Sequence, residues 1–322
     1  MRILVTGGAG FIGSHMVDRL LSKGHDVVVL DNLATGLRGN VPGTARFLWG
    51  DVSRLDDVGR AFEGGLDAVF HIAGQVSLIR SYADPTADLL TNVLGTVNVL
   101  KTCVKNRVPR LIYASSMTVY SGDAPLPTLE DSPCEPTSYY GITKWAGERY
   151  VHATAARRDL DFPFQATAFR MYNVYGSRQA LDNPYQGVLG IFIGNLLRDE
   201  PITIFGDGEQ TRDFIHISDI VDAWVNALQN PNAYGKSINL GSGKRLSINF
   251  LADAVLAAFD RTRKNHPVKY AASRSGEQRH VQANFTRAQQ LLGWEPRTSF
   301  EVGLAETVNW SVDFSKNVAR RS

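Results

Sequence analysis

A tyrosine and a lysine stand four residues apart in the segment 140–144, which reads Tyr-Gly-Ile-Thr-Lys. Four residues make about one helical turn, so Tyr140 and Lys144 would lie on the same face of a helix. A phenol with a pKa of about 10 is a poor base at neutral pH, but a neighbouring cation favours its phenolate form. Ser116 precedes Tyr140 by 24 residues and could donate a hydrogen bond to the same substrate oxygen. We therefore predict that Tyr140 is a general base with Ser116 and Lys144 as its partners.

A glycine-rich string at residues 7–13, Gly-Gly-Ala-Gly-Phe-Ile-Gly, follows a short apolar run. Between a strand and a helix, such glycines permit a tight turn and let a pyrophosphate approach the backbone at the helix N-terminus. Asp31, eighteen residues beyond Gly13, could accept hydrogen bonds from ribose hydroxyls. Its charge would repel a 2′-phosphate, and no arginine follows it in 32–35, so the pattern favours NAD over NADP.

A parallel sheet covered by helices would position these residues. From residue 2 to about 115, short apolar runs alternate with amphipathic stretches, which is typical of a doubly wound sheet. The expected strands are Arg2–Thr6, Asp26–Leu30, Ala45–Trp49, Ala68–Ile72 and Pro109–Ala114. A helix is expected over Ile12–Lys23, with Gly24 as its left-handed end. Without this context, Tyr140 and Lys144 would be an ordinary exposed pair on a helix surface.

The regular alternation of strands and helices changes after about residue 175. There the loops lengthen, and helical patterns at 218–229, 247–260 and 299–312 enclose short strands. We therefore expect a Rossmann-like NAD-binding domain over 1–175 and a smaller α/β substrate domain over 176–322. Part of 213–242 could return to the first sheet.

Composition and charge describe an ordinary folded protein. The chain has 322 residues, 43% of them hydrophobic, and a formal net charge of +2, which gives no sign of a nucleic-acid or membrane partner. It has no run of about 18 apolar residues, no export signal and only two cysteines. Its histidines lack metal-binding spacing. We expect a cytoplasmic protein without a metal.

Further strings along the chain match one known family. They are residues 71–74 (HIAG), 91–96 (TNVLGT), 115–120 (SSMTVY) and 173–179 (NVYGSRQ), then ITIFGDGEQTRDFIHISD and RSGEQRH leading to LLGWEP. With the glycine string and 140–144, they make the whole chain resemble the extended short-chain dehydrogenase/reductases. Within that family the chain is most similar to nucleotide-sugar 4-epimerases of the UDP-galactose 4-epimerase type.

The resemblance implies a role for each candidate site residue. The catalytic residues would be Ser116, Tyr140 and Lys144. The residues in contact with NAD would be Gly7, Gly10, Phe11, Ile12, Gly13, Asp31, Asn32, Asp51, Val52, Ile72, Ala73, Gly74, Asn92, Tyr140, Lys144 and Tyr172. The residues that bind the nucleotide sugar would be Ser116, Asn173, Arg178, Val188, Thr203, Phe205, Arg212, Arg274 and Glu277. Two of these, Arg212 and Arg274, suit a diphosphate because guanidinium groups bind it bidentately.

The reaction that the resemblance implies is inversion at C4 of a UDP-hexose, UDP-glucose or UDP-galactose, through a transient 4-keto sugar with tightly bound NAD. Met117 and Thr118 follow Ser116 where the family's 4,6-dehydratases carry Asp-Glu and its decarboxylases a Glu. The absence of these carboxylates weakens both of those readings. The family also implies a homodimer through helices within 86–106 and 138–157.

Other substrates and roles stay open at this point. The small Val281 would admit N-acetylhexosamines such as UDP-N-acetylglucosamine, and Arg178 could bind the C6 carboxylate of UDP-glucuronate. The string AGQV at 73–76 resembles CDP-sugar 2-epimerases. A non-catalytic NAD-binding sensor or scaffold would typically lack the Tyr or the Lys, and an NADPH reductase disagrees with Asp31.

Overall fold

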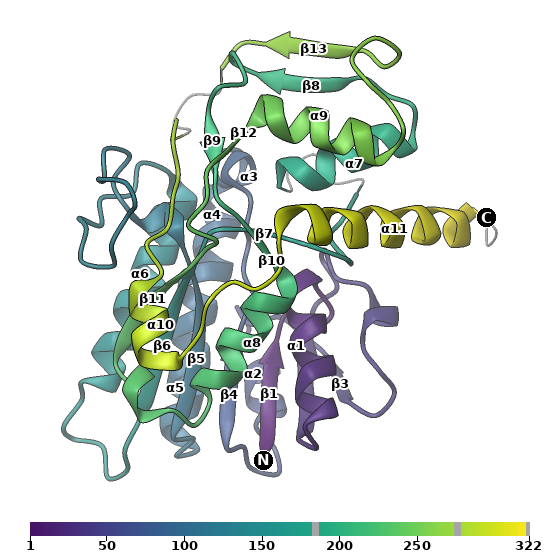
Figure 1. Ribbon diagram of the computed structural model, residues 1–322. Coiled ribbons are helices and arrows are strands. Elements are labelled where there is room, and N and C mark those ends of the chain that lie inside the picture. The colour runs from purple at the N-terminus through teal and green to yellow at the C-terminus, as the bar shows by residue number, and fades with distance from the viewer. Residues whose placement is uncertain (182–186, 274–277, 320–322) are drawn as a thin grey trace.

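A seven-stranded parallel sheet forms the centre of the larger part of the molecule (Figure 1). The computed structural model describes residues 1–181, 187–273 and 278–319. The strand order is β11-β6-β5-β4-β1-β2-β3, with bounds β1 (Arg2–Thr6), β2 (Asp26–Asp31), β3 (Arg46–Trp49), β4 (Ala68–His71), β5 (Arg110–Ser116), β6 (Gln165–Met171) and β11 (Lys236–Leu240). All five expected strands are present, with ends within two residues of those expected, and the doubly wound fold is confirmed.

Helices cover both faces of this sheet because successive side chains of each strand point to opposite faces, and both faces are apolar. Ile3 and Val5 of β1 pack on one side and Leu4 on the other. The first side is covered by α1 (Phe11–Ser22), α8 (Ile217–Ala227) and α10 (Thr286–Leu292). The second side is covered by α2 (Leu55–Ala61), α5 (Gly95–Lys105) and α6 (Tyr139–Ala155).

Short helical segments link β4 to α5. They are α3 (Leu78–Ala83), α4 (Pro85–Leu89) and a π-helical turn, η2 (Leu90–Leu94), which continues into α5. Both α3 and α4 lie against α6. Turns of the π type occur often at functional sites, and this one carries Asn92.

The smaller part of the chain has its own apolar core beside the main sheet (Figure 1). Its helices are α7 (Val188–Leu197), α9 (Ile248–Ala258) and α11 (Phe300–Ala319). The two-stranded pairs are β8 (Ile202–Phe205) with β13 (Val268–Ala271), β9 (Thr211–Arg212) with β12 (Leu246–Ser247), and β7 (Asn173–Tyr175) with β10 (Phe214–His216). Within the described ranges, no helix is long and apolar enough to cross a membrane.

The segment 213–242 links the two parts. Its helix α8 packs against α1, and its strand β11 pairs with β6 at the edge of the main sheet. Which part holds the cofactor and which the substrate remains a prediction.

Candidate active site

A cavity of about 440 Å³ lies at the carboxyl ends of the parallel strands, where ligands bind in open α/β sheets. Its wall contains every predicted NAD contact except Asn92, and also contains Ser116, Asn173 and Val188. The N-terminal end of α7 closes the side toward the smaller part of the chain. The fold therefore gathers most of the candidate residues around one space.

The glycine turn after β1 leaves backbone exposed to this cavity. Gly7 has φ +72°, and a Cβ there would lie 2.8 Å from Ala73 Cα. A Cβ on Gly13 would lie 2.0 Å from the Gly7 carbonyl oxygen, so only glycine allows α1 to start so close to the turn. Gly10, which lines the cavity, is the N-cap of α1. This cradle fits a pyrophosphate at a helix N-terminus.

Asp31 ends β2 beside the glycine turn. Its carboxylate accepts hydrogen bonds from the N–H groups of Ala9 (2.9 Å) and Leu33 (2.8 Å). Burial raises the pKa of Asp31, and these N–H donors lower it in part. Next to it, Asn32 donates to Asp51 at 2.8 Å. The carboxylates at the ends of two strands are thus held at the rim of the cavity, as a ribose and adenine site requires.

Tyr140 and Lys144 occupy the first turns of α6, which begins where Ser138 accepts a hydrogen bond from the N–H of Gly141. With Ser116 from the end of β5, they line the same cavity. The exposed fractions of Ser116, Tyr140 and Lys144 are 7%, 9% and 3%. The sheet therefore brings together the three residues to which the sequence assigned catalysis.

Burial dominates the electrostatics of this trio. Burial raises the pKa of Tyr140 to about 12, a hydrogen bond from Ser116 lowers it in part, and Asp88 raises it. Burial also lowers the pKa of Lys144 to about 8. Burial therefore opposes the phenolate form of Tyr140 in the protein without NAD. That Lys144 and an oxidised nicotinamide together favour the phenolate stays a prediction.

Ser116 is held as a hydrogen-bond donor. Its hydroxyl oxygen accepts from the Thr118 hydroxyl at 3.0 Å and from the Thr118 N–H at 3.3 Å. A serine oxygen has two acceptor positions, so its one proton is left to point elsewhere. That proton can serve Tyr140 or a substrate oxygen. Thr118 was not among the predicted site residues.

A buried ion pair lies behind the trio. Glu148, one turn beyond Lys144 on α6, accepts from Arg170 of β6 at 2.6 Å and from Ser237 at 2.6 Å. Burial would raise the pKa of Glu148, but the hydrogen bonds and charge of Arg170 lower it below its usual value. Arg170 also donates to the Tyr120 hydroxyl at 2.9 Å. The pair ties α6 to β6, next to the edge strand β11 of the main sheet.

The AGQV string has a structural explanation. The side-chain amide of Gln75 donates to the Ser77 carbonyl at 2.8 Å and to Asp88 at 2.7 Å. Its backbone N–H donates to Asn92 at 2.9 Å. A Cβ on Gly74 would lie 2.9 Å from the same Asn92 oxygen. These contacts give Gly74 and Gln75 a packing role in the cavity wall.

Several predicted residues lie away from the cavity wall. Asn92 stands behind Gly74, where it donates to Thr143 at 3.2 Å, and its contact with NAD stays a prediction. Arg178 forms an ion pair with Asp18 of α1 at 2.6 Å and is not among the wall residues, and its role toward a C6 carboxylate stays a prediction.

The remaining predicted substrate residues belong to the smaller part of the chain. Thr203 and Phe205 lie on β8 and Arg212 on β9, and none of the three forms the cavity wall in the described part of the chain. Arg274 and Glu277 fall outside the described residues. Sequence reasoning missed Gln75, Arg80, Thr91, Gln179 and Phe214, which do line the cavity. Four of them lie within strings that matched known families, so those strings were the signal that could have found them, whereas Arg80 of α3 lies outside any such string.

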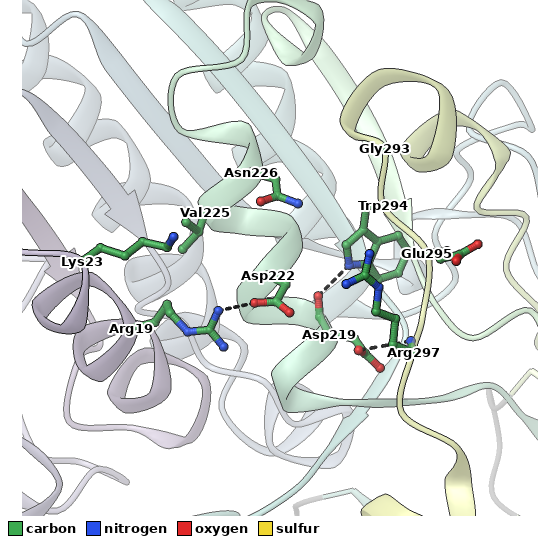
Figure 2. A pocket seen from close by; sticks show the side chains of 10 residues that line it. All are labelled: Arg19, Lys23, Asp219, Asp222, Val225, Asn226, Gly293, Trp294, Glu295 and Arg297. Atoms are coloured by element: carbon green, nitrogen blue, oxygen red, sulfur yellow. Dashed lines mark hydrogen bonds and ion pairs between the residues drawn. The ribbon is translucent and has the colours of Figure 1, made fainter.

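A second cavity, of about 230 Å³, lies between α1, α8 and residues 293–297 (Figure 2). Arg19 pairs there with Asp222, and Asp219 accepts a hydrogen bond from the backbone N–H of Arg297 at 3.2 Å. None of the predicted site residues lines it. Among residues 1–181, 187–273 and 278–319, no group of three or more metal-ligating side chains is placed to hold an ion.

Comparison with known proteins decides the family. The sequence model of the NAD dependent epimerase/dehydratase family matches residues 3–241. The chain belongs to this family. Its glycine turn and its Ser116–Tyr140–Lys144 trio both lie within the matched range, so this family member is an NAD-dependent enzyme.

Relatives extend the likeness over the whole length of this epimerase/dehydratase. UDP-glucose 4-epimerase of Mycolicibacterium smegmatis is 38% identical over 318 residues, which are 96% of this chain and 98% of that protein. UDP-glucose 4-epimerase with UDP-glucose from Thermotoga maritima has a TM-score of 0.91 at 35% identity, covering 99% and 100% of the two chains. UDP-N-acetylglucosamine 4-epimerase from Methanobrevibacter ruminantium, in complex with UDP-N-acetylmuramic acid, has a TM-score of 0.89 at 30% identity, covering 97% and 98%.

Proposed function

We propose that the protein is a UDP-glucose 4-epimerase, which interconverts UDP-glucose and UDP-galactose through a transient 4-keto sugar. The observation that carries this proposal is the meeting of Ser116, Tyr140 and Lys144 in one cavity with the glycine turn. The substrate follows from relatives at 35% and 38% identity that carry this name.

Each residue of the trio has a defined task in this reaction. Tyr140 takes the proton of the C4 hydroxyl and later returns one to the C4 oxygen. Ser116 donates a hydrogen bond to the same oxygen, since Thr118 fills its acceptor positions. Lys144 supplies positive charge beside the phenol. NAD, which the glycine turn and Asp31 would hold, would supply the acceptor and donor of the C4 hydride, and its oxidised ring would add the positive charge that the phenolate needs.

The neighbours of Ser116 argue against elimination and decarboxylation. Both reactions need a further carboxylic acid beside the sugar, and here Met117 and Thr118 hold the positions where related enzymes carry it. Arg178 is engaged by Asp18, so no described feature favours UDP-glucuronate.

UDP-N-acetylglucosamine is the second candidate substrate. Val281 is 3% exposed and packs in one cluster with Tyr172 and Met117. Tyr172 and Met117 also line the cavity. A valine leaves more room at this wall than a larger side chain would, and the Methanobrevibacter ruminantium relative bears the name of an epimerase for that sugar.

An incubation without added cofactor tests the function. The purified protein is mixed separately with UDP-glucose, UDP-glucuronate and UDP-N-acetylglucosamine, and the products are resolved by NMR. We expect UDP-galactose from UDP-glucose, with inversion at C4 and not at C2. If NAD is present in the protein and none of the three sugars is epimerised, the proposal fails.

We also propose a homodimer formed by the outer surface of α4, η2 and α6. Leu89, Leu90, Leu94, Ile142 and Tyr150 are 38% to 52% exposed there, an unusual exposure for large apolar side chains. A second copy would cover them.

Light scattering after size exclusion tests this assembly. The double variant Leu94→Glu/Ile142→Glu should elute as a monomer, because the charges would be buried at the interface. The control is Val302→Glu, a change on α11 at a site that is 54% exposed. A double variant that elutes as a dimer would refute this interface.

We also propose which part of the chain binds each ligand and where the protein is located. Residues 1–175 would bind NAD and 176–322 the nucleotide sugar, with β11 as a part of the first sheet. We place the activity in the cytoplasm, where free thiols such as Cys103 and Cys134 stay reduced.

A further inference from the structure

Asp88 is a buried carboxylate that the proposed reaction does not use. It lies on α4 with 0% exposure. One of its oxygens accepts from the Thr143 hydroxyl at 2.6 Å. The other accepts from the amide of Gln75 at 2.7 Å and from that of Asn92 at 3.1 Å. A buried charge is costly unless it is paired and hydrogen-bonded.

The contacts of Asp88 join four elements around the catalytic lysine. Gln75 belongs to the loop that forms the cavity wall, Asn92 to the π-helical turn, and Thr143 to α6 directly before Lys144. Gly74 of the same wall has room for no side chain, since a Cβ would lie 2.9 Å from Asn92 and 3.6 Å from Lys144 Nζ. Asp88 therefore fixes the distance between the wall and Lys144.

The other described groups around Lys144 do not neutralise its ammonium charge, which leaves Asp88. The ammonium lies 4.6 Å from the ring centre of Tyr113. Burial lowers the pKa of His71 to about 3, so that imidazole is neutral. Glu148 is the second carboxylate near Lys144, but it is bound to Arg170.

Asp88 has no such cation bound to it. In the described part of the chain no arginine or lysine forms an ion pair with Asp88. Burial raises its pKa, which donors such as Thr143 and Gln75 and the charge of Lys144 counteract. Its negative charge acts on Lys144 and on Tyr140, and it raises the pKa of both.

We propose that Asp88 is a positioning residue for the catalytic trio: its carboxylate holds the cavity wall through Gln75 and keeps the Lys144 ammonium protonated inside the protein. The importance of that charge for turnover rests on the proposed function. The charge itself is a property of the protein and can be measured without substrate.

The variant Asp88→Asn removes the charge and keeps the shape. Its side-chain oxygen can still accept from Gln75 and Asn92, and the Thr143 hydroxyl can turn to the Tyr140 carbonyl, 3.1 Å away. The matched control is Asp84→Asn. Asp84 is an exposed residue that caps α4, and asparagine caps equally well.

NMR titration of carbon-13-labelled lysine side chains measures the effect. The signal of Lys144 is identified by its loss in Lys144→Met. In Asp88→Asn we expect Lys144 to lose its proton about one pH unit lower than in the wild type. Asp84→Asn should leave this titration unchanged. An unshifted Lys144 in folded Asp88→Asn protein would overturn the proposal.

A second measurement needs no variant to fold. The carboxyl signal of Asp88, assigned in labelled wild-type protein, should be that of a carboxylate throughout the titration of Lys144. A protonated Asp88 in that range would overturn the proposal.

The pH profile of epimerisation links the Asp88 charge to turnover. In Asp88→Asn, both the acidic and the basic limb of the rate-against-pH curve should move to lower pH. The reason is that Lys144 loses its proton at lower pH and the Tyr140 phenolate forms more easily. A merely structural role would lower the rate without moving the limbs, and that result would overturn the catalytic part of the proposal. If wild-type protein epimerises no sugar, the proposed function fails, while the lysine titration still decides the role of the Asp88 charge.

Discussion

Replacing Tyr140 by phenylalanine is expected to lower kcat for epimerisation by about 10²–10⁴-fold, the range that a positioned general base contributes. The phenol oxygen is the only part removed, so the glycine turn and Asp31 should still hold NAD. Turnover is followed by NMR with UDP-glucose, and bound NAD is quantified after the protein is denatured.

Tyr139→Phe is the matched control, because Tyr139 is the adjacent residue of α6 and is 48% exposed. It should retain wild-type kcat. If Tyr140→Phe keeps its activity, Tyr140 is not the base. If Tyr140→Phe loses NAD as well as activity, the loss of turnover comes from the missing cofactor, and this result does not support Tyr140 as the base.

Replacing Arg170 by methionine should lower the free energy of unfolding by about 3–5 kcal/mol, since it leaves the Glu148 charge buried without its cation. The two side chains are 5% and 0% exposed. Chemical denaturation at neutral pH measures the change. The double variant Glu148→Leu/Arg170→Met should recover part of this stability, because no unpaired charge then remains.

The control for this pair is Arg157→Met, which breaks the exposed ion pair with Asp159. Water already solvates both of those charges, so its stability should not change measurably. The pH dependence has a definite sign. Arg170 holds the pKa of Glu148 below its unfolded value, so the stabilisation is present above that value and is lost as the pH falls through the folded pKa. A loss that is equal in acid and at neutral pH would contradict this account.

Local patterns in the sequence predicted the parts that depend on near neighbours. The apolar runs from Arg2 to Ala114 gave the strands, because residues buried on both faces of a parallel sheet are apolar throughout. The glycines of the 7–13 turn and the spacing of Tyr140 and Lys144 are equally local. A positive φ and one helical turn are each specified by a few consecutive residues.

The environment of these residues could not be predicted in the same way. Asp88 and Thr143 are 55 residues apart, and Arg170 and Glu148 are 22 apart. No local signal marked Asp88 as a part of the site. Its contact with Thr143 exists only because the segment after β4 and the helix α6 are packed together.

The sequence by itself determined the doubly wound fold and the glycine turn, and it pointed to Ser116, Tyr140 and Lys144 as candidate catalytic residues, because each of these signals lies in residues close together in the chain. Only the tertiary structure decided their electrostatics: burial makes Tyr140 harder to ionise, Asp88 and Glu148 offset a part of the desolvation of Lys144, and Arg178 forms an ion pair with Asp18. The physical reason is that desolvation and charge coupling depend on which segments meet in space, and distant positions in the chain carry no local trace of that meeting.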